Sequence, residues 1–293
     1  MTTRRQFLQQ SAVLSAAAFI DPSELFKKNK GLGIQLYTVR SEVAKDLANS
    51  LAQIANAGYT NVELFGYNNR KFFGKSVAET AALLQQYNLK SPSGHYMLQD
   101  FMFNDNYNWD SWKYLVEDSK ALGHKYIVIP WIPEPQRTAD NIKRIADRLN
   151  KGAEIAKEAG MCAAYHNHDF EFKKMDGDMT GLDYLLTNTD AKNVKFELDI
   201  YWVVFAGLNP IDLFNKYPGR FAMWHVKDME KGENGAKGQS CEVGKGIINW
   251  KEIYAARKKS GLEIPYVEQE AYRHPVFECI KTSADYLKAN KLI

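Results

Sequence analysis

Cysteine and long hydrophobic runs are scarce in this sequence. Its 293 residues include only three cysteines, which are widely spaced at Cys162, Cys241 and Cys279. An odd, scattered set of this kind excludes a disulfide framework and a zinc ribbon. The apolar stretch near the N-terminus is too short to cross a bilayer, and no other stretch reaches that length. The sequence therefore predicts no membrane span.

Net charge is also small. The chain carries 38 Lys and Arg against 35 Asp and Glu, which gives a formal net charge of +3. Arg4 and Arg5 supply two of those charges, so the remainder of the chain is almost neutral. Because a nucleic-acid-binding protein usually has a marked basic excess, we expect no nucleic-acid partner.

The sequence lacks a glycine-rich loop that leads from a strand into a helix, the loop that commonly holds a phosphate group. The first predicted strand is followed by TVRSEV, which contains no glycine. Such a loop is expected in a doubly wound nucleotide-binding sheet, so this alternative architecture is disfavoured. No linker or low-complexity run indicates a second domain.

Residues 1–21 have the pattern of an export signal. The basic pair Arg4-Arg5 is followed by Phe7 and Leu8 and then by the small apolar run SAVLSAAAFI. This pattern resembles the twin-arginine signal of bacteria, whose substrates are exported already folded. We therefore expect residues 1–21 to be removed from a periplasmic or otherwise exported protein that acquires its cofactor in the cytoplasm.

Strand-like and helix-like segments alternate strictly from residue 30 to residue 293. Short apolar runs predict eight strands, and the amphipathic stretches between them, often closed by a glycine, predict helices. Ser76 and Glu79 have the spacing of a capping box at the start of one helix. Eight such units in one chain predict a single (β/α)8 TIM barrel. The predicted strands are residues 31–39, 61–66, 91–97, 125–131, 163–172, 194–203, 220–228 and 264–270.

Polar side chains gather at the C-terminal ends of the last four predicted strands. In a barrel these ends meet on one face, where catalytic residues lie. His166 and His168 are two residues apart, so both face the same side of a strand. Imidazole and carboxylate groups together make a mixed nitrogen and oxygen site that suits Mn²⁺, Co²⁺, Zn²⁺ or Mg²⁺. The whole group comprises His166, His168, Asp199, His225, Lys227, Asp228, Glu268 and Glu270.

Four segments around these residues, YHNHDFEF, ELDIYW, MWHVKD and YVEQE, resemble the sugar phosphate isomerase/epimerase family. That family belongs to the xylose-isomerase-like TIM barrels, which also include ketose 3-epimerases, inosose dehydratases and endonuclease IV. The similarity extends over residues 31–287. It implies a metal-dependent enzyme that acts on a sugar or keto-sugar.

The resemblance also implies one divalent metal ion, held by one residue from each of strands five to eight. By position these residues are His166, Asp199, His225 and Glu268. Ketose 3-epimerases have a glutamate at the first of these positions, and it is one of their two acid–base carboxylates. Here the position holds His166, as in dehydratase-like relatives, with His168 as its substitute. Endonuclease IV needs a three-metal cluster and a basic groove, which this near-neutral, exported chain does not favour.

A metal that chelates a carbonyl and an adjacent hydroxyl acidifies the C–H between them, so that a base can form an enediolate. The predicted base is Glu268, Glu171 or His95, with Glu270 and Lys227 as the next candidates. Lys227 is otherwise expected to stabilise the oxyanion. Reprotonation would isomerise or epimerise the sugar, whereas loss of a β-leaving group would make the enzyme a lyase or dehydratase of a 3-keto-glycoside or inosose. A non-catalytic sugar-binding barrel is the rival from another class.

Aromatic and polar side chains near the strand ends predict where a carbohydrate substrate lies, because aromatic rings can stack on the C–H faces of a sugar. The missing phosphate loop and the predicted export both favour an unphosphorylated sugar. The sequence leaves open whether the protein forms a homo-oligomer. The expected substrate contacts are Gln35, Tyr37, Glu63, Trp131, His168, Trp202 and Glu270.

Overall fold

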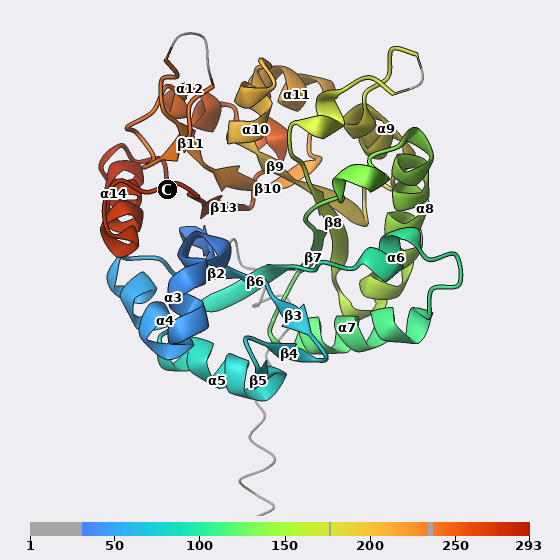
Figure 1. Cartoon of the computed structure of the whole chain (residues 1–293), viewed down its shortest axis with the longest axis horizontal. Coiled ribbons are helices and arrows are strands. Elements are labelled where there is room, and N and C mark those ends of the chain that lie inside the picture. The colour runs from blue at the N-terminus through green and yellow to red at the C-terminus, as the bar shows by residue number, and fades with distance from the viewer. Residues whose placement is uncertain (1–30, 176, 234–236) are drawn as a thin grey trace, which may run out of the picture.

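The computed structural model describes residues 31–175, 177–233 and 237–293, which form a closed barrel of eight parallel strands (Figure 1). Each barrel strand pairs with the next one along the chain, and the last pairs with the first. The predicted TIM barrel is therefore confirmed. Its strands are β1 (Gly33–Gln35), β2 (Asn61–Leu64), β6 (Lys90–His95), β7 (Tyr126–Ile129), β8 (Cys162–His166), β9 (Val194–Asp199), β10 (Phe221–Val226) and β13 (Ile264–Val267).

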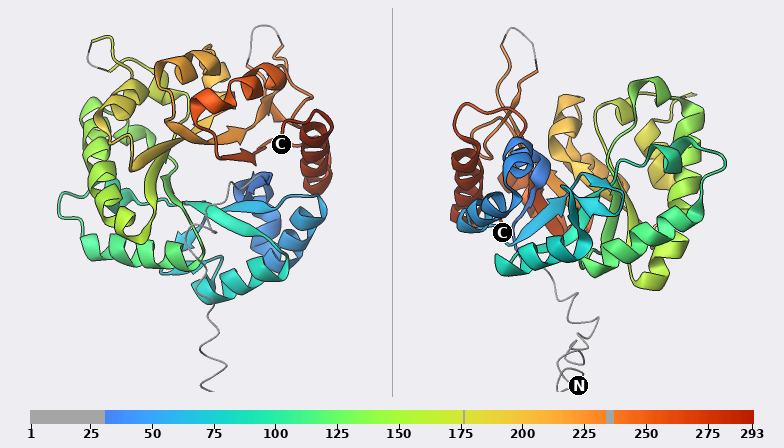
Figure 2. Two further views of the ribbon diagram at one scale, coloured as in Figure 1. Left: turned by 180° about the vertical axis from the view of Figure 1, so that it is seen from behind. Right: turned by 60° about the horizontal axis from the view of Figure 1, so that its bottom comes forward.

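Helices surround the barrel on its outer side, as Figure 1 and the two further views of Figure 2 show. Ser76 and Glu79 form the predicted capping box, and Asn209 and Asn249 cap two later helices. The main helices are α3 (Arg40–Lys45), α4 (Leu47–Asn56), α5 (Val77–Gln86), α6 (Gln99–Phe103), α7 (Trp109–Ala121), α8 (Ala139–Ala156), α9 (Gly181–Asn188), α10 (Ile200–Phe205), α11 (Pro210–Lys216), α12 (Trp250–Ala255), α13 (Arg257–Ser260) and α14 (Val276–Ala289). α14 packs beside α4, which closes the helical ring.

Two groups of buried apolar side chains stabilise the barrel. The larger lies between the strands and the surrounding helices, as expected for a parallel sheet that helices cover. The smaller fills the barrel interior and includes Ala164, Met223 and Tyr266. Each of these three residues precedes a polar strand-end residue by two positions and therefore faces the same side of its strand. The apolar interior thus lies directly beneath the polar site.

All eight barrel strands end earlier than predicted, most of all the strand predicted over 163–172, which ends at His166. At two of them a polar side chain turns the backbone at the strand end. The side chain of Gln35 accepts the N–H two residues further on, and the chain enters the 3₁₀ turn η1 (Leu36–Val39). Asp199 acts in the same way at the end of β9: its Oδ1 accepts the N–H of Tyr201 at 2.9 Å and caps α10. The predictions of strands over 31–39 and 194–203 were therefore too long. The turns after Gln35 and Asp199 lead the chain across the C-terminal face of the barrel.

Loops after β2 and β10 carry short antiparallel strands that the sequence did not predict. Three of them, β3 (Tyr67–Asn68), β4 (Lys71–Phe72) and β5 (Lys75–Ser76), form one small sheet. The other pair is β11 (Asp228–Met229) with β12 (Ser240–Cys241). These pairings fix loops that border the C-terminal face of the barrel.

The predicted leader, residues 1–21, lies outside the described residues. Residues 176 and 234–236 also lie outside the described residues. Within the three described ranges, no helix is both long and apolar enough to cross a membrane.

Candidate active site

Five of the predicted site residues meet at the C-terminal ends of the barrel strands. His95, His166 and Asp199 are the last residues of β6, β8 and β9, His225 lies near the end of β10, and Glu268 follows β13. All five side chains are buried. Their convergence follows from parallel strand order, since every strand presents its C-terminal end to the same face.

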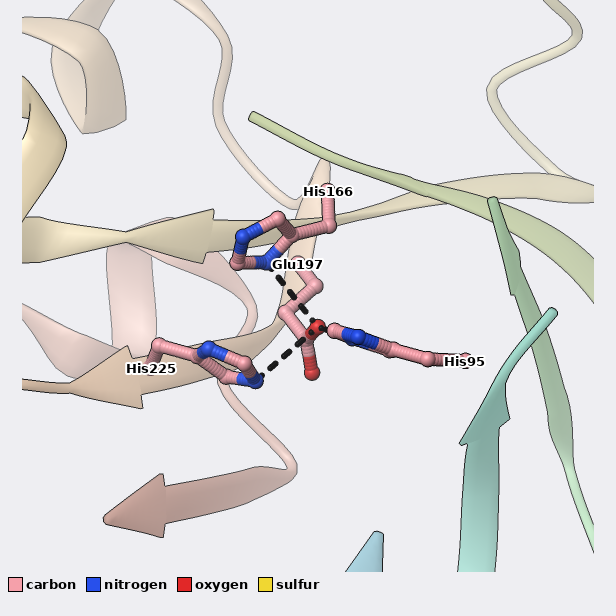
Figure 3. A group of neighbouring side chains, drawn as sticks. All are labelled: His95, His166, Glu197 and His225. Carbon is pink, nitrogen blue, oxygen red and sulfur yellow. Dashed lines mark hydrogen bonds and ion pairs between the residues drawn. The ribbon is translucent and has the colours of Figure 1, made fainter. Parts of the chain in front are cut away.

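Glu197 lies at the centre of an inner layer of this site (Figure 3). Its Oε2 is 2.6 Å from His95 Nε2 and 3.1 Å from both His166 Nδ1 and His225 Nε2. These donor atoms are close enough together to be considered for a metal ion. The carboxylate oxygen itself, however, occupies the point on which the three imidazoles converge. The arrangement is therefore a hydrogen-bonded network in which a carboxylate orients three histidine rings.

Glu63 extends the inner layer toward the apolar interior of the barrel. Its Oε2 accepts a hydrogen bond from Gln35 Nε2 at 2.7 Å and lies 2.9 Å from His225 Nε2. Its Oε1 accepts from the Ser93 hydroxyl, which is 2.7 Å from the Tyr266 hydroxyl. Gln35 and Glu63 are fully buried in this network. Both were expected to contact substrate, but the structure places them in the layer that supports the histidines.

The outer layer contains the second ring nitrogen of His166 and of His225, the nitrogen that does not face Glu197. His166 Nε2 and His225 Nδ1 each lie 4.0 Å from Asp199 Oδ2. His225 Nδ1 is also 3.1 Å from Glu268 Oε2. Of the four residues that the family resemblance assigned to a metal, Asp199, His225 and Glu268 bring one donor atom each to a common place, and His166 approaches it through Asp199. His166, rather than its substitute His168, takes part in this arrangement.

Asp199 Oδ2 is buried and has no hydrogen-bond partner among the described residues. A buried carboxylate oxygen without a donor is costly, so a native structure usually supplies it with a partner. Two imidazole nitrogens and two carboxylate oxygens form a ligand set that Zn²⁺, Mn²⁺ or Co²⁺ accepts. The residues present therefore fit one divalent cation.

The two histidines of the outer layer differ in charge. Burial lowers the pKa of His225, but Glu197 and Glu268 outweigh burial and raise it well above its usual value, so that a cation would displace a proton from this ring. Burial and the charge of Glu268 together raise the pKa of Asp199 to about 7, against the lowering effect of Lys227. Burial lowers the pKa of His166 to about 4, so its ring is neutral near pH 7. Because its Nδ1 faces Glu197, the neutral ring presents its Nε2 lone pair to Asp199.

His95 is positively charged near pH 7, whereas a general base must be neutral. Burial lowers its pKa, but the Glu63 and Glu197 carboxylates outweigh burial and raise the pKa to about 9. The ring also stacks on His225, with centroids 5.3 Å apart. An imidazolium can donate a proton or stabilise negative charge, but it cannot accept a proton.

Glu171 does not join this cluster, because its carboxylate binds to β8 and to the turn that follows it. Its Oε1 accepts the Tyr165 hydroxyl at 2.6 Å, and its Oε2 accepts the His168 backbone N–H at 2.8 Å. Tyr165 belongs to the core between strands and helices, and Glu171 is buried beside it. Both carboxylate oxygens thus anchor the turn after β8, a role that does not favour the expected function as a base.

Lys227, Glu270, His168 and Trp202 border the outer layer. Burial lowers the pKa of Lys227, but Glu268, Asp199 and Glu270 outweigh burial and raise it, so the ammonium is charged. Glu270 is exposed and contacts this ammonium. His168 and Trp202 lie with ring centroids 5.4 Å apart. Their Nδ1 and Nε1 atoms are buried and lack a hydrogen-bond partner in the described part of the chain, so both can bind a substrate hydroxyl.

Tyr37 and Trp131 occupy loops that follow β1 and β7. The Tyr37 side chain is 41% exposed, packs edge-on against Phe65, and lies beneath the Arg40 guanidinium at 4.7 Å. Trp131 is half-buried beneath the Arg137 guanidinium, which is 5.4 Å from the ring centroid. Both rings remain candidates for stacking on a sugar at the border of the site.

The sequence reasoning missed Glu197, which orients three imidazoles. A signal was present: Glu197 and Asp199 are two residues apart in one strand and therefore face the same side. Asp228 shows the reverse case, since it was grouped with the site but anchors a loop. It accepts five hydrogen bonds, from the backbone N–H groups of Met229, Gly244, Gly246 and Ile248 and from the Trp250 indole.

The chain belongs to the family of xylose isomerase-like TIM barrels, whose family model matches residues 51–290. A sugar phosphate isomerase/epimerase from Parabacteroides distasonis ATCC 8503 superposes with a TM-score of 0.76 and 28% identity, covering 89% of this chain and 94% of that one. A zinc-bound IolI protein shares the fold, with a TM-score of 0.69, 19% identity and coverage of 89% and 96%.

Among curated relatives, an inosose dehydratase from Lacticaseibacillus casei is 28% identical over 172 residues, which are 53% of this chain and 57% of the dehydratase. The chain thus spans about half the length of the curated relatives it matches.

Proposed function

We propose that this protein is a divalent-metal-dependent isomerase or epimerase of an unphosphorylated sugar or keto-sugar that acts through an enediolate. The observation that supports this proposal best is the buried Oδ2 of Asp199, which accepts no hydrogen bond from the described residues and faces donor atoms of His166 and His225 beside Glu268. These four residues would hold the cation. When bound, a divalent cation acidifies the C–H beside a chelated carbonyl.

The remaining residues of the site supply proton transfer and charge stabilisation. Glu270 is the carboxylate best placed to accept the substrate proton, because it is exposed and adjoins the outer layer through Lys227. The buried Lys227 ammonium stabilises the negative charge that develops on the substrate oxygen. His168 Nδ1 and Trp202 Nε1 bind further hydroxyl groups of the sugar.

Elimination from a 3-keto-glycoside or an inosose is the second candidate function. His166 occupies the strand-five position at which ketose 3-epimerases carry a catalytic glutamate, so a two-glutamate epimerisation lacks one of its carboxylates. The similarity to an inosose dehydratase supports the same alternative. Both reactions share proton removal beside a carbonyl and differ only in how the enediolate decays.

Solvent deuterium exchange tests the shared first step. The protein is loaded with Mn²⁺ and incubated in D₂O with a panel of keto-sugars, 3-keto-glycosides and inososes, and substrate C–H exchange and products are followed by NMR. We expect exchange with at least one compound, and the product then distinguishes isomerisation from elimination. Asp199→Ala should lose both Mn²⁺ binding and exchange. Binding of a sugar to the Mn²⁺-loaded protein without any exchange would support the non-catalytic sugar-binding barrel instead.

The base is tested by a matched pair of glutamate variants. At saturating Mn²⁺, so that the ion is bound even if its affinity has changed, Glu270→Gln should lose exchange by about 10²–10⁴-fold, which is typical of a lost general base. Glu171→Gln should retain exchange, because the native carboxylate serves Tyr165 and the His168 N–H. Loss of exchange in Glu171→Gln with normal exchange in Glu270→Gln would instead identify Glu171 as the base.

A further inference from the structure

Lys227 is a buried ammonium placed among the carboxylates of the proposed metal site. Its Nζ lies 3.3 Å from Glu268 Oε2 and 3.8 Å from Asp199 Oδ2, and it contacts Glu270 Oε1. The side chain is only 2% exposed. A charged group held this deep requires opposite charges nearby, and these three carboxylates supply them.

Two of the oxygens that face the ammonium are those expected to ligate the cation. Asp199 Oδ2 and Glu268 Oε2, together with His225, form a group whose donor atoms lie within metal-binding distance of one another. An ammonium less than 4 Å from these oxygens and a divalent cation bound by them repel each other. The two positive charges therefore compete for the same pair of carboxylates.

We propose that Lys227 is a built-in counter-ion that competes with the divalent cation for Asp199 and Glu268 and so weakens metal affinity to an exchangeable level. This inference rests on the metal site of the proposed function. In the metal-free protein the ammonium neutralises the two buried carboxylates and keeps them in place. When a cation binds, the ammonium gives up these two contacts.

Glu270 provides the alternative partner that this exchange requires. Its carboxylate contacts Lys227 from the exposed side of the site, while its backbone N–H is fixed by the Ser240 hydroxyl at 2.9 Å. The rings of Tyr201 and Trp202 lie 5.0 and 5.1 Å from Nζ and stabilise the charge by cation–π interaction. The ammonium can therefore move off Asp199 and Glu268 and still be paired.

Two variants should change metal affinity in opposite directions. Lys227→Met removes the competing charge while keeping an unbranched, buried side chain, and it should bind Mn²⁺ about 10–100-fold more tightly than the wild-type protein. Glu270→Gln removes the alternative partner and should bind Mn²⁺ about 10-fold more weakly. Lys216→Met is the control, because that ammonium pairs with Asp183 at the surface, and its Mn²⁺ affinity should be unchanged.

The measurement is calorimetric titration of Mn²⁺ into the metal-free full chain, with thermal unfolding as a second readout. Metal-free Lys227→Met should unfold at a lower temperature than the wild-type protein, and Mn²⁺ should restore it. Unchanged or weaker Mn²⁺ binding by Lys227→Met overturns the counter-ion role while leaving the proposed metal site intact. If Lys227→Met does not fold without metal, Glu270→Gln decides, and unchanged affinity in that variant overturns the proposal. Failure of the wild-type protein and every variant to bind Mn²⁺ overturns both this inference and the proposed function.

Discussion

Glu197 fixes the ring orientation of His166 and His225, the two histidines of the outer layer. Its Oε2 faces His95, His166 and His225, and no other described carboxylate oxygen is shown to contact all three rings. A histidine that ligates a metal needs its other nitrogen held by an acceptor, which fixes both the ring orientation and the tautomer. Glu197→Gln places an amide donor or a weaker acceptor at this point. We therefore expect Mn²⁺ affinity to fall about 10–100-fold in this variant, as measured by calorimetric titration.

The control for this prediction is Glu158→Gln, which changes an exposed carboxylate at the outer end of the long helix before β8. Its Mn²⁺ affinity should equal that of the wild-type protein. Wild-type affinity in Glu197→Gln would show that the three imidazoles hold their orientation without this carboxylate.

Glu171 should make stability depend on pH. Burial raises its pKa from 4.5 to about 7, although the Tyr165 hydroxyl and the His168 N–H lower it. The folded protein therefore retains a proton that the unfolded chain releases above about pH 4.5. The stabilisation is fully present below that pH and is lost as the pH rises through about 7. Relative to Glu171→Gln, the wild-type free energy of unfolding should fall between about pH 5 and pH 8.

Urea unfolding of both proteins at a series of pH values measures this difference. Each protein serves as the other's reference, because all remaining titratable groups are shared. Parallel stability curves across the range would mean that Glu171 titrates at its ordinary pKa in the folded protein.

At the scale of elements, the loop between β11 and α12 depends on a single buried carboxylate. Asp228 accepts five hydrogen bonds, four from backbone N–H groups and one from the Trp250 indole at 2.9 Å. This gathering of donors requires Gly246, since a side chain there would meet Asp228 Oδ1 at 2.2 Å. The carboxylate thus fixes the loop that leads away from Lys227.

Asp228→Asn should destabilise the protein by about 3 kcal/mol, because its amide would place donors against buried donors. Glu230→Gln is the control in the same loop: Glu230 pairs with the exposed Arg273, and such surface pairs contribute about 0–1 kcal/mol. Denaturant unfolding measures both values. Equal stability of the two variants would show that the loop does not depend on Asp228.

Strand ends were the elements least predictable from sequence. Apolar runs such as GLGIQLYTV continue past Gln35, and nothing in their composition indicates where extended backbone stops. At two strands the end point is set by a side-chain oxygen, of Gln35 or of Asp199, that accepts the backbone N–H two residues later. This local hydrogen bond competes with the strand, and its geometry is not visible in an apolar pattern.

At the scale of the whole molecule, eight alternating units were enough to predict the closed barrel, because strand order and chain direction place all C-terminal strand ends on one face. The same rule brought together the four predicted ligands at the ends of strands five to eight. It did not indicate which polar residues point inward toward the barrel core. Glu63 and Glu197 lie on separate strands and are joined into one network by His95 and His225, each of which contacts both carboxylates.

The N-terminal sequence supports a last proposal about the whole molecule, which is that the protein is exported through a twin-arginine route. The basis is the Arg4-Arg5 pair followed by Phe7-Leu8 and an alanine-rich run. Replacing both arginines by lysine keeps the positive charge but removes the twin-arginine pair, so export should be lost. The barrel begins with β1 at Gly33, so the fold and the urea midpoint of the retained protein should be unchanged.

Cell fractionation with an antibody to the barrel measures this outcome, and mass spectrometry of the exported protein should find residues up to about 18–21 removed. A variant with Lys27 and Lys28 changed to arginine is the matched control, since it alters two basic residues beyond the predicted leader. The control should be exported normally. Unchanged export of the double lysine variant would exclude the twin-arginine route, because that route depends on the arginine pair itself and a general secretory signal requires only positive charge.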